Sequence, residues 1–369
     1  MAGIYLHIPF CRQACYYCNF HFVTSPRHKN ELLAALLKEL ELRREYLGDS
    51  TVETIYFGGG TPSLLETQEL RSQVEQIRSV YPLSDNPEIT LETNPDDING
   101  EKLAAWKELG INRLSIGVQS FFEEDLQWMN RAHNASQAFE SVQMALQYFD
   151  NITIDLIYGT PLLSNEKWEQ NVSTATRLNI PHLSCYALTV EPKTPLQKMI
   201  HQGKLQDVNP DKQSEQFLLL MQWLKDAGYE HYEISNFARP GFRSRHNSAY
   251  WQGKKYLGIG PSAHSFDGKS RQWNIANNIQ YTASILQNNI PFEKEVLTAT
   301  QKTNEYIMTS LRTIEGLDLS RLDDITRGKL QAIAKKYIDA GLMKRNDDFL
   351  VLTKEGKLLA DGIAAELFS

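Results

Sequence analysis

The sequence has few cysteines, no long apolar run and no excess of positive charge. No stretch approaches the roughly 20 consecutive apolar residues that a membrane-spanning helix needs, and no Pro-rich or Ser/Gly-rich tract marks a linker. Among the 369 residues, 38 are Lys or Arg and 45 are Asp or Glu, so the formal net charge is -7. Without a basic run, the sequence does not favour a nucleic acid as a partner.

The few cysteines are concentrated near the start of the chain. Three of the four, Cys11, Cys15 and Cys18, lie within HIPFCRQACYYCNFHF at residues 7–22. The chain begins Met-Ala-Gly without a charged leader or cleavage signal, so we expect a cytoplasmic protein in a reducing compartment. There the three cysteines favour a metal or cluster site over a disulfide. The fourth, Cys185, is interpreted as a buried core residue of an apolar strand.

Extended apolar runs alternate with amphipathic helical patterns from about residue 3 to residue 235. The predicted strands cover residues 3–8, 52–58, 88–93, 113–118, 151–158, 182–189 and 231–235. This alternation indicates parallel βαβ units. We therefore expect an α/β fold with a partial (β/α)6 TIM-like barrel over residues 1–235. A barrel-closing segment is expected over residues 236–300, and a small winged-helix-like domain over residues 301–369.

Polar residues that packing does not require follow one another at the carboxyl ends of these predicted strands. They are the loop that contains Cys11, Cys15 and Cys18 (the cysteine loop), GGGTPS at 58–63, Glu92, Gln119, Asp155 and the pair Tyr186 and Ala187. In a barrel, the carboxyl ends of the strands carry the active site. The sequence therefore predicts that these residues meet in one functional site.

The C-x3-C-x2-C spacing admits two kinds of metal site. Three thiolates can hold a 4Fe-4S cluster in which one iron has no cysteine ligand. The alternative is a structural zinc of the Cys3His type, with His21 or His7 as the fourth ligand. A structural zinc needs neither a glycine-rich loop nor facing carboxylates, so the other strand-end residues favour the cluster.

The cysteine motif, with Tyr17 before the last cysteine, resembles the signature of the radical S-adenosylmethionine (SAM) enzymes. The resemblance extends through YFGGGTPS, LETNP, SIGVQSF, NRAH, DLIYGTP, RHNSAYW and YLGIGPSAHSF. It is specific to the HemN/HemW branch, in which HemN is the oxygen-independent coproporphyrinogen III dehydrogenase and HemW is a heme chaperone. The resemblance implies a partial barrel, a small helical C-terminal domain and a 4Fe-4S cluster whose open iron is chelated by SAM.

The resemblance also implies which residues hold SAM. Glu92 resembles the ribose-binding carboxylate, and Arg131 is suited to the SAM carboxylate, although a surface ion pair would explain Arg131 as well. The other implied contacts are Tyr5, Tyr17, Gly59, Gly60, Thr61, Gln119, Asp155 and Ala187. The glycines have a second explanation, a tight strand-to-helix turn before Pro62. His7 and His21 then need no metal role.

Two differences from HemN favour the chaperone. Phe20 stands where HemN has a fourth cysteine, and the N-terminal cover of HemN is expected to be missing because the first strand begins at residue 3. RHNSAYW resembles the HemW-type H-N-x-x-Y-W segment. His246 would offer a neutral imidazole to heme iron, and Tyr250 and Trp251 would offer flat faces to the macrocycle. The alternative is structural, with Asn247 capping a turn and the aromatic residues filling the barrel mouth.

The sequence therefore predicts a heme chaperone that delivers heme to apo-hemoproteins such as respiratory-chain subunits. His264 is the second candidate for a heme ligand, and the family resemblance suggests a homodimer. Whether the protein is also an enzyme stays open. One alternative is an oxidoreductase that decarboxylates coproporphyrinogen while it cleaves SAM, and a weaker one is a heme-opening radical SAM methyltransferase.

Overall fold

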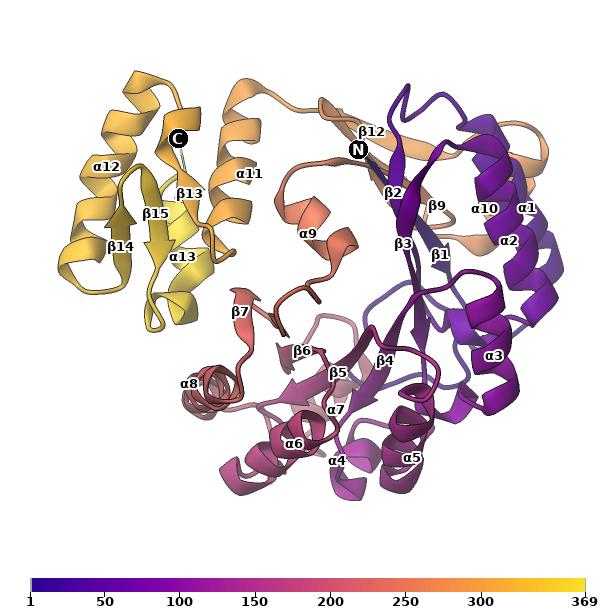
Figure 1. The fold of residues 1–369 in the computed structure, drawn as a ribbon, viewed down its shortest axis with the longest axis horizontal. Coiled ribbons are helices and arrows are strands. Elements are labelled where there is room, and N and C mark those ends of the chain that lie inside the picture. Colours follow the sequence, from indigo (N-terminus) through magenta and orange to yellow (C-terminus); the bar gives the residue numbers. More distant parts are fainter. Residues whose placement is uncertain (1, 369) are drawn as a thin grey trace.

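The structure, a computed structural model, describes residues 2–368 and is built around one curved sheet (Figure 1). Within these residues the sheet has 12 strands in the order β12-β11-β10-β9-β1-β2-β3-β4-β5-β6-β8-β7. The central strands are β1 (Ala2–Ile8), β2 (Val52–Gly59), β3 (Leu83–Thr93), β4 (Arg113–Gln119), β5 (Ile152–Tyr158) and β6 (His182–Ala187). These strands pair in parallel, as the sequence predicts.

Helices follow the parallel strands, and most of them cover the outer side of the sheet (Figure 1). They are α1 (Lys29–Leu42), α2 (Thr67–Val80), α3 (Gly100–Glu108), α4 (Glu123–Trp128), α5 (Ala135–Ala145), α6 (Asn165–Arg177), α7 (Pro195–His201) and α8 (Pro210–Asp226). Unlike the others, α7 packs on the loop that holds the cysteines, where the Leu196 N–H donates to the Tyr16 carbonyl at 2.9 Å. Leu103 and Trp106 of α3 are fully buried, and Gly110 follows the helix with a φ of 87° that favours glycine. The α/β fold with a mostly parallel central sheet is thereby confirmed.

Residues 236–300 extend the sheet at both of its ends. Their strands, together with β7 (Glu230–Glu233), are β8 (Asn236–Ala238), β9 (Lys255–Ile259), β10 (His264–Phe266), β11 (Ser270–Asn274) and β12 (Phe292–Val296). β8 joins β6 in antiparallel pairing, whereas β9 joins β1 in parallel and starts the antiparallel run to β12. Since β7 and β12 are the two ends of the described sheet, the barrel stays open, and α9 (Arg245–Trp251) lies in its opening (Figure 1).

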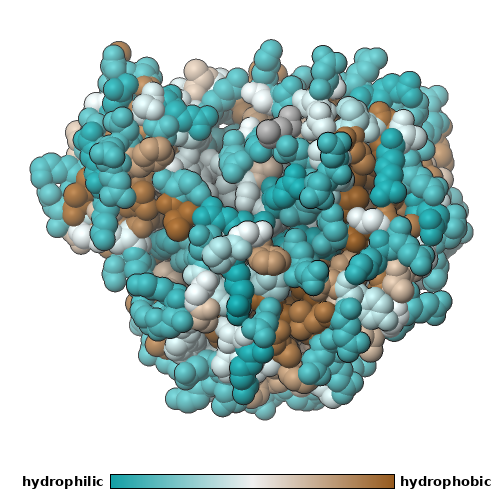
Figure 2. Space-filling view, viewed as in Figure 1, coloured by the Kyte–Doolittle hydropathy of each residue, from teal (hydrophilic) through white to brown (hydrophobic). Residues whose placement is uncertain are grey.

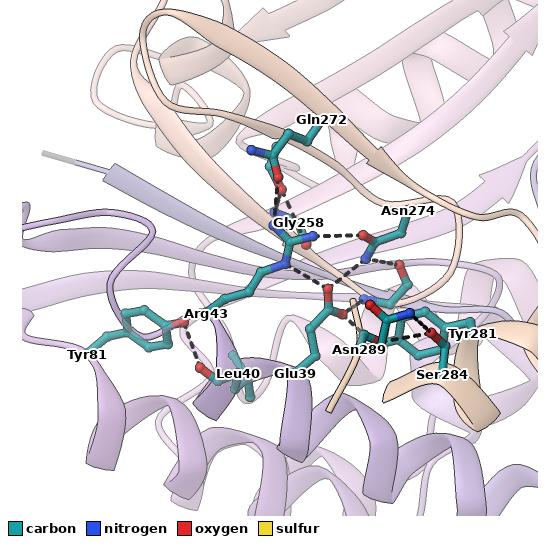
Figure 3. A network of polar contacts seen from close by, with 12 residues as sticks. Glu39, Leu40, Arg43, Tyr81, Gly258, Gln272, Asn274, Tyr281, Ser284 and Asn289 are labelled. Atoms are coloured by element: carbon teal, nitrogen blue, oxygen red, sulfur yellow. Dashed lines mark hydrogen bonds and ion pairs between the residues drawn. The ribbon is translucent and has the colours of Figure 1, made fainter. Parts of the chain in front are cut away.

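A buried polar network attaches this extension to α1 (Figure 3). Arg43 lies 2.9 Å from Glu39, and donates to Gln272 and Asn274, also at 2.9 Å. Glu39 in turn accepts a hydrogen bond from the hydroxyl of Tyr281 in α10 (Asn278–Leu286). The Glu39 and Arg43 side chains are 0% and 3% exposed, so each charge depends on these partners for its stabilisation.

The C-terminal domain packs its own core across the opening from α9 (Figure 1). Its elements are α11 (Ala299–Leu311), β13 (Leu317–Asp318), α12 (Asp324–Asp339), β14 (Met343–Asn346), β15 (Phe349–Leu352) and α13 (Ala360–Glu366). The predicted helix, two-stranded wing and final helix are all present, and in the described residues β13 adds a third strand to the wing. The domain reaches the sheet edge, where Ile314 donates its N–H to the Tyr232 carbonyl at 2.9 Å.

The surface of the face shown in Figure 2 is mostly hydrophilic, with hydrophobic side chains gathered in separate patches. In residues 2–368 no helix combines the length and apolar character needed to cross a bilayer.

Candidate functional site

The carboxyl ends of the parallel strands surround a pocket of about 450 Å³. Its lining contains nearly every residue that the sequence assigned to the cluster and SAM: Cys11, Cys15, Tyr17, Cys18, Gly59, Gly60, Thr61, Glu92, Gln119, Arg131, Asp155 and Ala187. Tyr5 is absent from the lining. It lies behind the pocket in β1, stacked on Tyr56 with ring centroids 6.0 Å apart. The expected convergence at the strand ends is therefore observed.

Backbone hydrogen bonds fix the shape of the cysteine loop, which borders this pocket. The N–H of Cys11 donates to the Val23 carbonyl at 3.0 Å, and a turn brings the N–H of Cys18 within 3.3 Å of the Cys15 carbonyl. All three cysteines are half-buried free thiols. Burial raises the pKa of Cys11 to about 11, because a thiolate in a partly apolar site loses hydration. A bound metal would supply the positive charge that stabilises these thiols as thiolates.

The geometry bears on the choice between zinc and a cluster. In residues 2–368 no three His, Cys, Asp or Glu side chains approach closely enough to hold one metal ion. Both candidate histidines have other partners: His7 Nε2 bonds the His21 carbonyl at 2.8 Å, and His21 Nε2 bonds Asn278 at 2.6 Å. A cluster makes a different demand, because each thiolate bonds a different iron. The loop and its pocket therefore fit a 4Fe-4S cluster better than a Cys3His zinc.

The glycines at the end of β2 and directly after it pack on β1 and the residues that follow β1. Gly59 has a φ of 107°, and a Cβ there would lie 2.5 Å from the His7 ring. A Cβ on Gly60 would lie 2.5 Å from the Phe10 carbonyl oxygen. Only glycine fits such contacts. The tight turn is therefore sufficient to explain these glycines, and their contact with SAM stays a prediction.

Two carboxyl groups lie in the pocket in unusual electrostatic surroundings. Glu92 accepts hydrogen bonds from the Tyr56 hydroxyl at 2.9 Å and from the Gly59 N–H at 3.0 Å. Burial nevertheless raises the pKa of Glu92 to about 7, and the neighbouring charge of Asp155 adds to this shift. Burial likewise raises the pKa of Asp155 to about 6. Hydroxyl groups of a ligand could supply the donors that these carboxylates lack.

Arg131 links the cysteine loop to the strand ends. Its guanidinium donates to Cys15 Sγ at 3.3 Å, to Asn94 at 2.7 Å and to the Gly117 carbonyl at 2.8 Å. Its Nε is buried and has no hydrogen-bond partner among residues 2–368. Arg131 therefore faces the site rather than forming a surface ion pair. Gln119, also at the site, adopts a φ of 67°, a backbone conformation that costs energy for a residue other than glycine.

A second, larger cavity of about 1270 Å³ lies between α9, the sheet and the C-terminal domain. Aromatic side chains from all three parts line it, namely Tyr232, Tyr250, Trp251, Tyr256, Phe266 and Tyr306, and arginines accompany them. Tyr186 borders this cavity and also the pocket with the cysteines, so the two spaces adjoin. Sequence reasoning missed the part played by the C-terminal domain, because no motif signals it.

Within α9, the three residues assigned to heme have different surroundings. Tyr250 and Trp251 line the larger cavity, whereas His246 is 2% exposed and is not part of the lining. Ser244, rather than Asn247, caps the helix by accepting the Asn247 N–H at 3.3 Å. His264, the second candidate, lies on β10, stacks on Trp273 and borders neither space.

Comparison with known proteins identifies the family. The family model for the radical SAM superfamily matches residues 5–175, and that for the HemN C-terminal domain matches residues 297–359. The chain is 33% identical to the heme chaperone HemW of Bacillus subtilis, over 98% of both chains. The chain belongs to the HemW family of radical SAM proteins.

Other members of the HemW family give the same result. The HemW of Mycobacterium tuberculosis (strain CDC 1551 / Oshkosh) is 34% identical over 99% of this chain and 94% of its own. The HemW of Escherichia coli K12 is 32% identical over 99% of this chain and 97% of its own. The solved coproporphyrinogen III oxidase HemN of E. coli superposes with a TM-score of 0.86, covering 100% of this chain and 90% of its own. At 24% identity, that superposition shows the shared fold.

Membership of the radical SAM superfamily implies a 4Fe-4S cluster and SAM, which agrees with the residues that surround the smaller pocket. Two further residues of interest were not singled out from the sequence. The Tyr56 hydroxyl donates to Glu92 while its ring stacks on Tyr5. The Thr54 hydroxyl forms a hydrogen bond with His246. Tyr56 lies within YFGGGTPS and could have been noticed there, whereas nothing near Thr54 signals its contact with a residue 192 positions away.

Proposed function

We propose that this HemW-family protein is a heme chaperone that holds a 4Fe-4S cluster and SAM in the smaller pocket and heme in the larger cavity. The observation that carries the proposal is the position of Tyr186 in the lining of both spaces. A cavity of about 1270 Å³ with aromatic walls suits a flat macrocycle. The HemW relatives are heme chaperones, which supports the same function.

The residues of the smaller pocket fit the cluster and SAM. Cys11, Cys15 and Cys18 would bind three irons of the cluster, which would leave the fourth iron open to the amino and carboxylate groups of SAM. We assign the unpartnered Nε of Arg131 to the SAM carboxylate. Glu92 would accept the ribose hydroxyls. The other proposed contacts are Tyr5, Tyr17, Gly59, Gly60, Thr61, Gln119, Asp155 and Ala187.

The larger cavity offers polar groups suited to the carboxylates of heme. Among residues 2–368, the buried Nε1 of Trp251 and Nε of Arg312 have no hydrogen-bond partner, and both residues line the cavity. The Arg312 guanidinium carbon lies 5.5 Å from the centre of the Trp251 ring, so the two donors come from neighbouring side chains. Heme propionates are acceptors of the required charge. Delivery to apo-hemoproteins such as respiratory-chain subunits, a cytoplasmic location and a homodimer stay predictions.

The adjoining cavities also suit a second candidate function, that of a coproporphyrinogen-decarboxylating oxidoreductase. In such an enzyme the substrate would occupy the larger cavity beside SAM. The test is anaerobic reconstitution with iron and sulfide, followed by separate assays with heme and with coproporphyrinogen III in the presence of SAM and a reductant. We expect stoichiometric heme binding and no loss of coproporphyrinogen. Consumption of coproporphyrinogen without specific heme binding would replace the chaperone by the oxidoreductase.

A further inference from the structure

Both ring nitrogens of His246 are already occupied within the protein. Nδ1 lies 2.7 Å from the Thr54 hydroxyl, and Nε2 lies 2.9 Å from the Tyr250 hydroxyl. The ring is also stacked on Tyr56, with centroids 5.0 Å apart. Glu88 fixes the start of α9 by accepting the backbone N–H of His246 at 3.0 Å. A heme iron in the larger cavity could reach Nε2 only after the Tyr250 hydroxyl had moved away.

Tyr250 occupies the position between this histidine and the cavity. It lines the cavity, and its ring packs edge-on against His246 at 5.0 Å and against Tyr256 at 4.6 Å. A tyrosine hydroxyl hydrogen-bonded to an imidazole keeps a lone pair for a further partner. An iron in the cavity would therefore meet the Tyr250 hydroxyl before it met His246 Nε2.

We propose that the phenolic oxygen of Tyr250, rather than a nitrogen of His246, is the axial ligand that this chain offers to ferric heme. His246 is then a positioning residue that supports the bound phenolate through its hydrogen bond. This inference rests on the proposed function, since it names the ligand within the same heme cavity. Tyrosine is an established type of axial ligand for heme iron.

The ligand exchange balances without an oxidant or a reductant. The O–H bond of Tyr250 breaks, an oxygen–iron(III) bond replaces the bond between iron(III) and a water molecule of the dissolved heme, and that water and the proton leave to solvent through the cavity. The Thr54 hydroxyl can donate to Nδ1, which leaves the proton of the neutral imidazole on Nε2, where it can point at the phenolate. Burial lowers the pKa of His246 to about 3, so the ring stays neutral and no second charge is created. Burial also raises the pKa of Tyr250, so its phenol stays protonated until iron binds.

The experiment is a titration of ferric heme into the full-length, cluster-reconstituted protein, read by resonance Raman spectroscopy in the phenolate-to-iron charge-transfer band. The wild type should show ring vibrations of an iron-bound phenolate. Tyr250→Phe keeps the ring but removes the oxygen, so these vibrations should disappear and ferric-heme affinity should fall about tenfold or more. Tyr256→Phe is the matched control, because Tyr256 lines the same cavity but bonds Arg271 at 3.0 Å, and it should keep the wild-type spectrum.

A variant of the partner residue separates positioning from ligation. His246→Gln should keep the phenolate vibrations, shifted because the hydrogen bond to the oxygen has changed. A wild-type spectrum in Tyr250→Phe, with ligation lost in His246→Gln, would make His246 the ligand and overturn the inference while leaving the chaperone function standing. Absence of stoichiometric heme binding by the wild-type protein would instead overturn the proposed function, and this inference with it.

Discussion

At the scale of single residues, the three clustered cysteines differ from Cys185 in what surrounds them. Cys11, Cys15 and Cys18 are half-buried around the smaller pocket, whereas Cys185 is 1% exposed within β6. Replacing any one of the three by Ala should abolish or severely weaken cluster assembly. Iron and sulfide analysis after anaerobic reconstitution should give about four of each per wild-type chain. Cys185→Ala should match the wild type, and stoichiometric zinc that resists replacement by iron would contradict the assignment.

Glu92 should make the stability of the unliganded protein depend on pH. Its pKa is 4.5 as an ordinary glutamate and about 7 in the folded chain, so the folded state holds the proton more tightly. Stability from this group is therefore present below pH 4.5 and is lost as pH rises through 7. Glu92→Gln stays neutral at every pH. From pH 5 to pH 8, the free energy of unfolding of the variant should rise by about 2 to 3 kcal/mol relative to the wild type.

Urea unfolding of both proteins at the two pH values measures this difference. Asp155 titrates in the same direction, with its pKa raised to about 6, and its charge also raises the pKa of Glu92, so the measured difference includes the coupling between the two groups. A difference between variant and wild type that does not change with pH would show that Glu92 is ionised throughout.

At the scale of elements, α9 should bind heme through its aromatic surface. Trp251→Ala removes a ring that lines the larger cavity, so heme affinity should fall, by about tenfold. The axial ligand is untouched, and the absorption spectrum of the bound heme should therefore stay that of the wild type. Trp273→Ala is the control, because Trp273 lies on β11 and borders neither cavity. Equal loss of affinity in both variants would contradict heme binding against α9.

The network between α1 and β11 should contribute strongly to stability. Arg43→Ala leaves the buried carboxylate of Glu39 without its ionic partner, which typically costs about 3 to 5 kcal/mol of unfolding free energy. Arg44→Ala is the control one residue away. Its side chain is 58% exposed, so its loss should change stability by less than about 1 kcal/mol. Chemical denaturation of the two variants measures both effects. Equal losses of unfolding free energy in Arg43→Ala and Arg44→Ala would show that the buried network adds no particular stability.

The sequence predicts elements well where the signal is local. Each parallel strand from β1 to β6 is an apolar run followed by its own helix, and polar residues mark the strand ends that form the smaller pocket. The extension from β9 to β12 is different, because its strands are short and their polar residues pair with partners far away. Gln272 bonds a residue 229 positions earlier, and no local pattern encodes such a contact.

The heme assignment shows the same limit at a finer level. The motif in α9 is visible in the sequence, and Tyr250 and Trp251 line the larger cavity, whereas their contact with heme stays a prediction. The orientation of His246 is decided by Thr54 and Tyr56, both on β2 and remote in sequence. The residue types could therefore be predicted, whereas which atom faces the cavity could not.

At the scale of the whole molecule, the open barrel leaves room for two adjoining spaces of different character. The strand ends form the smaller pocket, and the C-terminal domain completes the larger cavity opposite α9 (Figure 1). Arg312 and Tyr306 come from α11 or directly after it, so the cavity exists only when both domains are in place. A heme bound in this cavity, as proposed, would contact both domains.

The most direct test of the chaperone function is heme transfer. The reconstituted protein is loaded with one equivalent of heme, freed of excess heme and mixed with an apo-hemoprotein, whose absorption spectrum reports its loading. We predict that heme leaves the protein and fills the acceptor, while the same protein with SAM and reductant leaves coproporphyrinogen III intact. An acceptor that stays empty while coproporphyrinogen III is consumed would contradict the account.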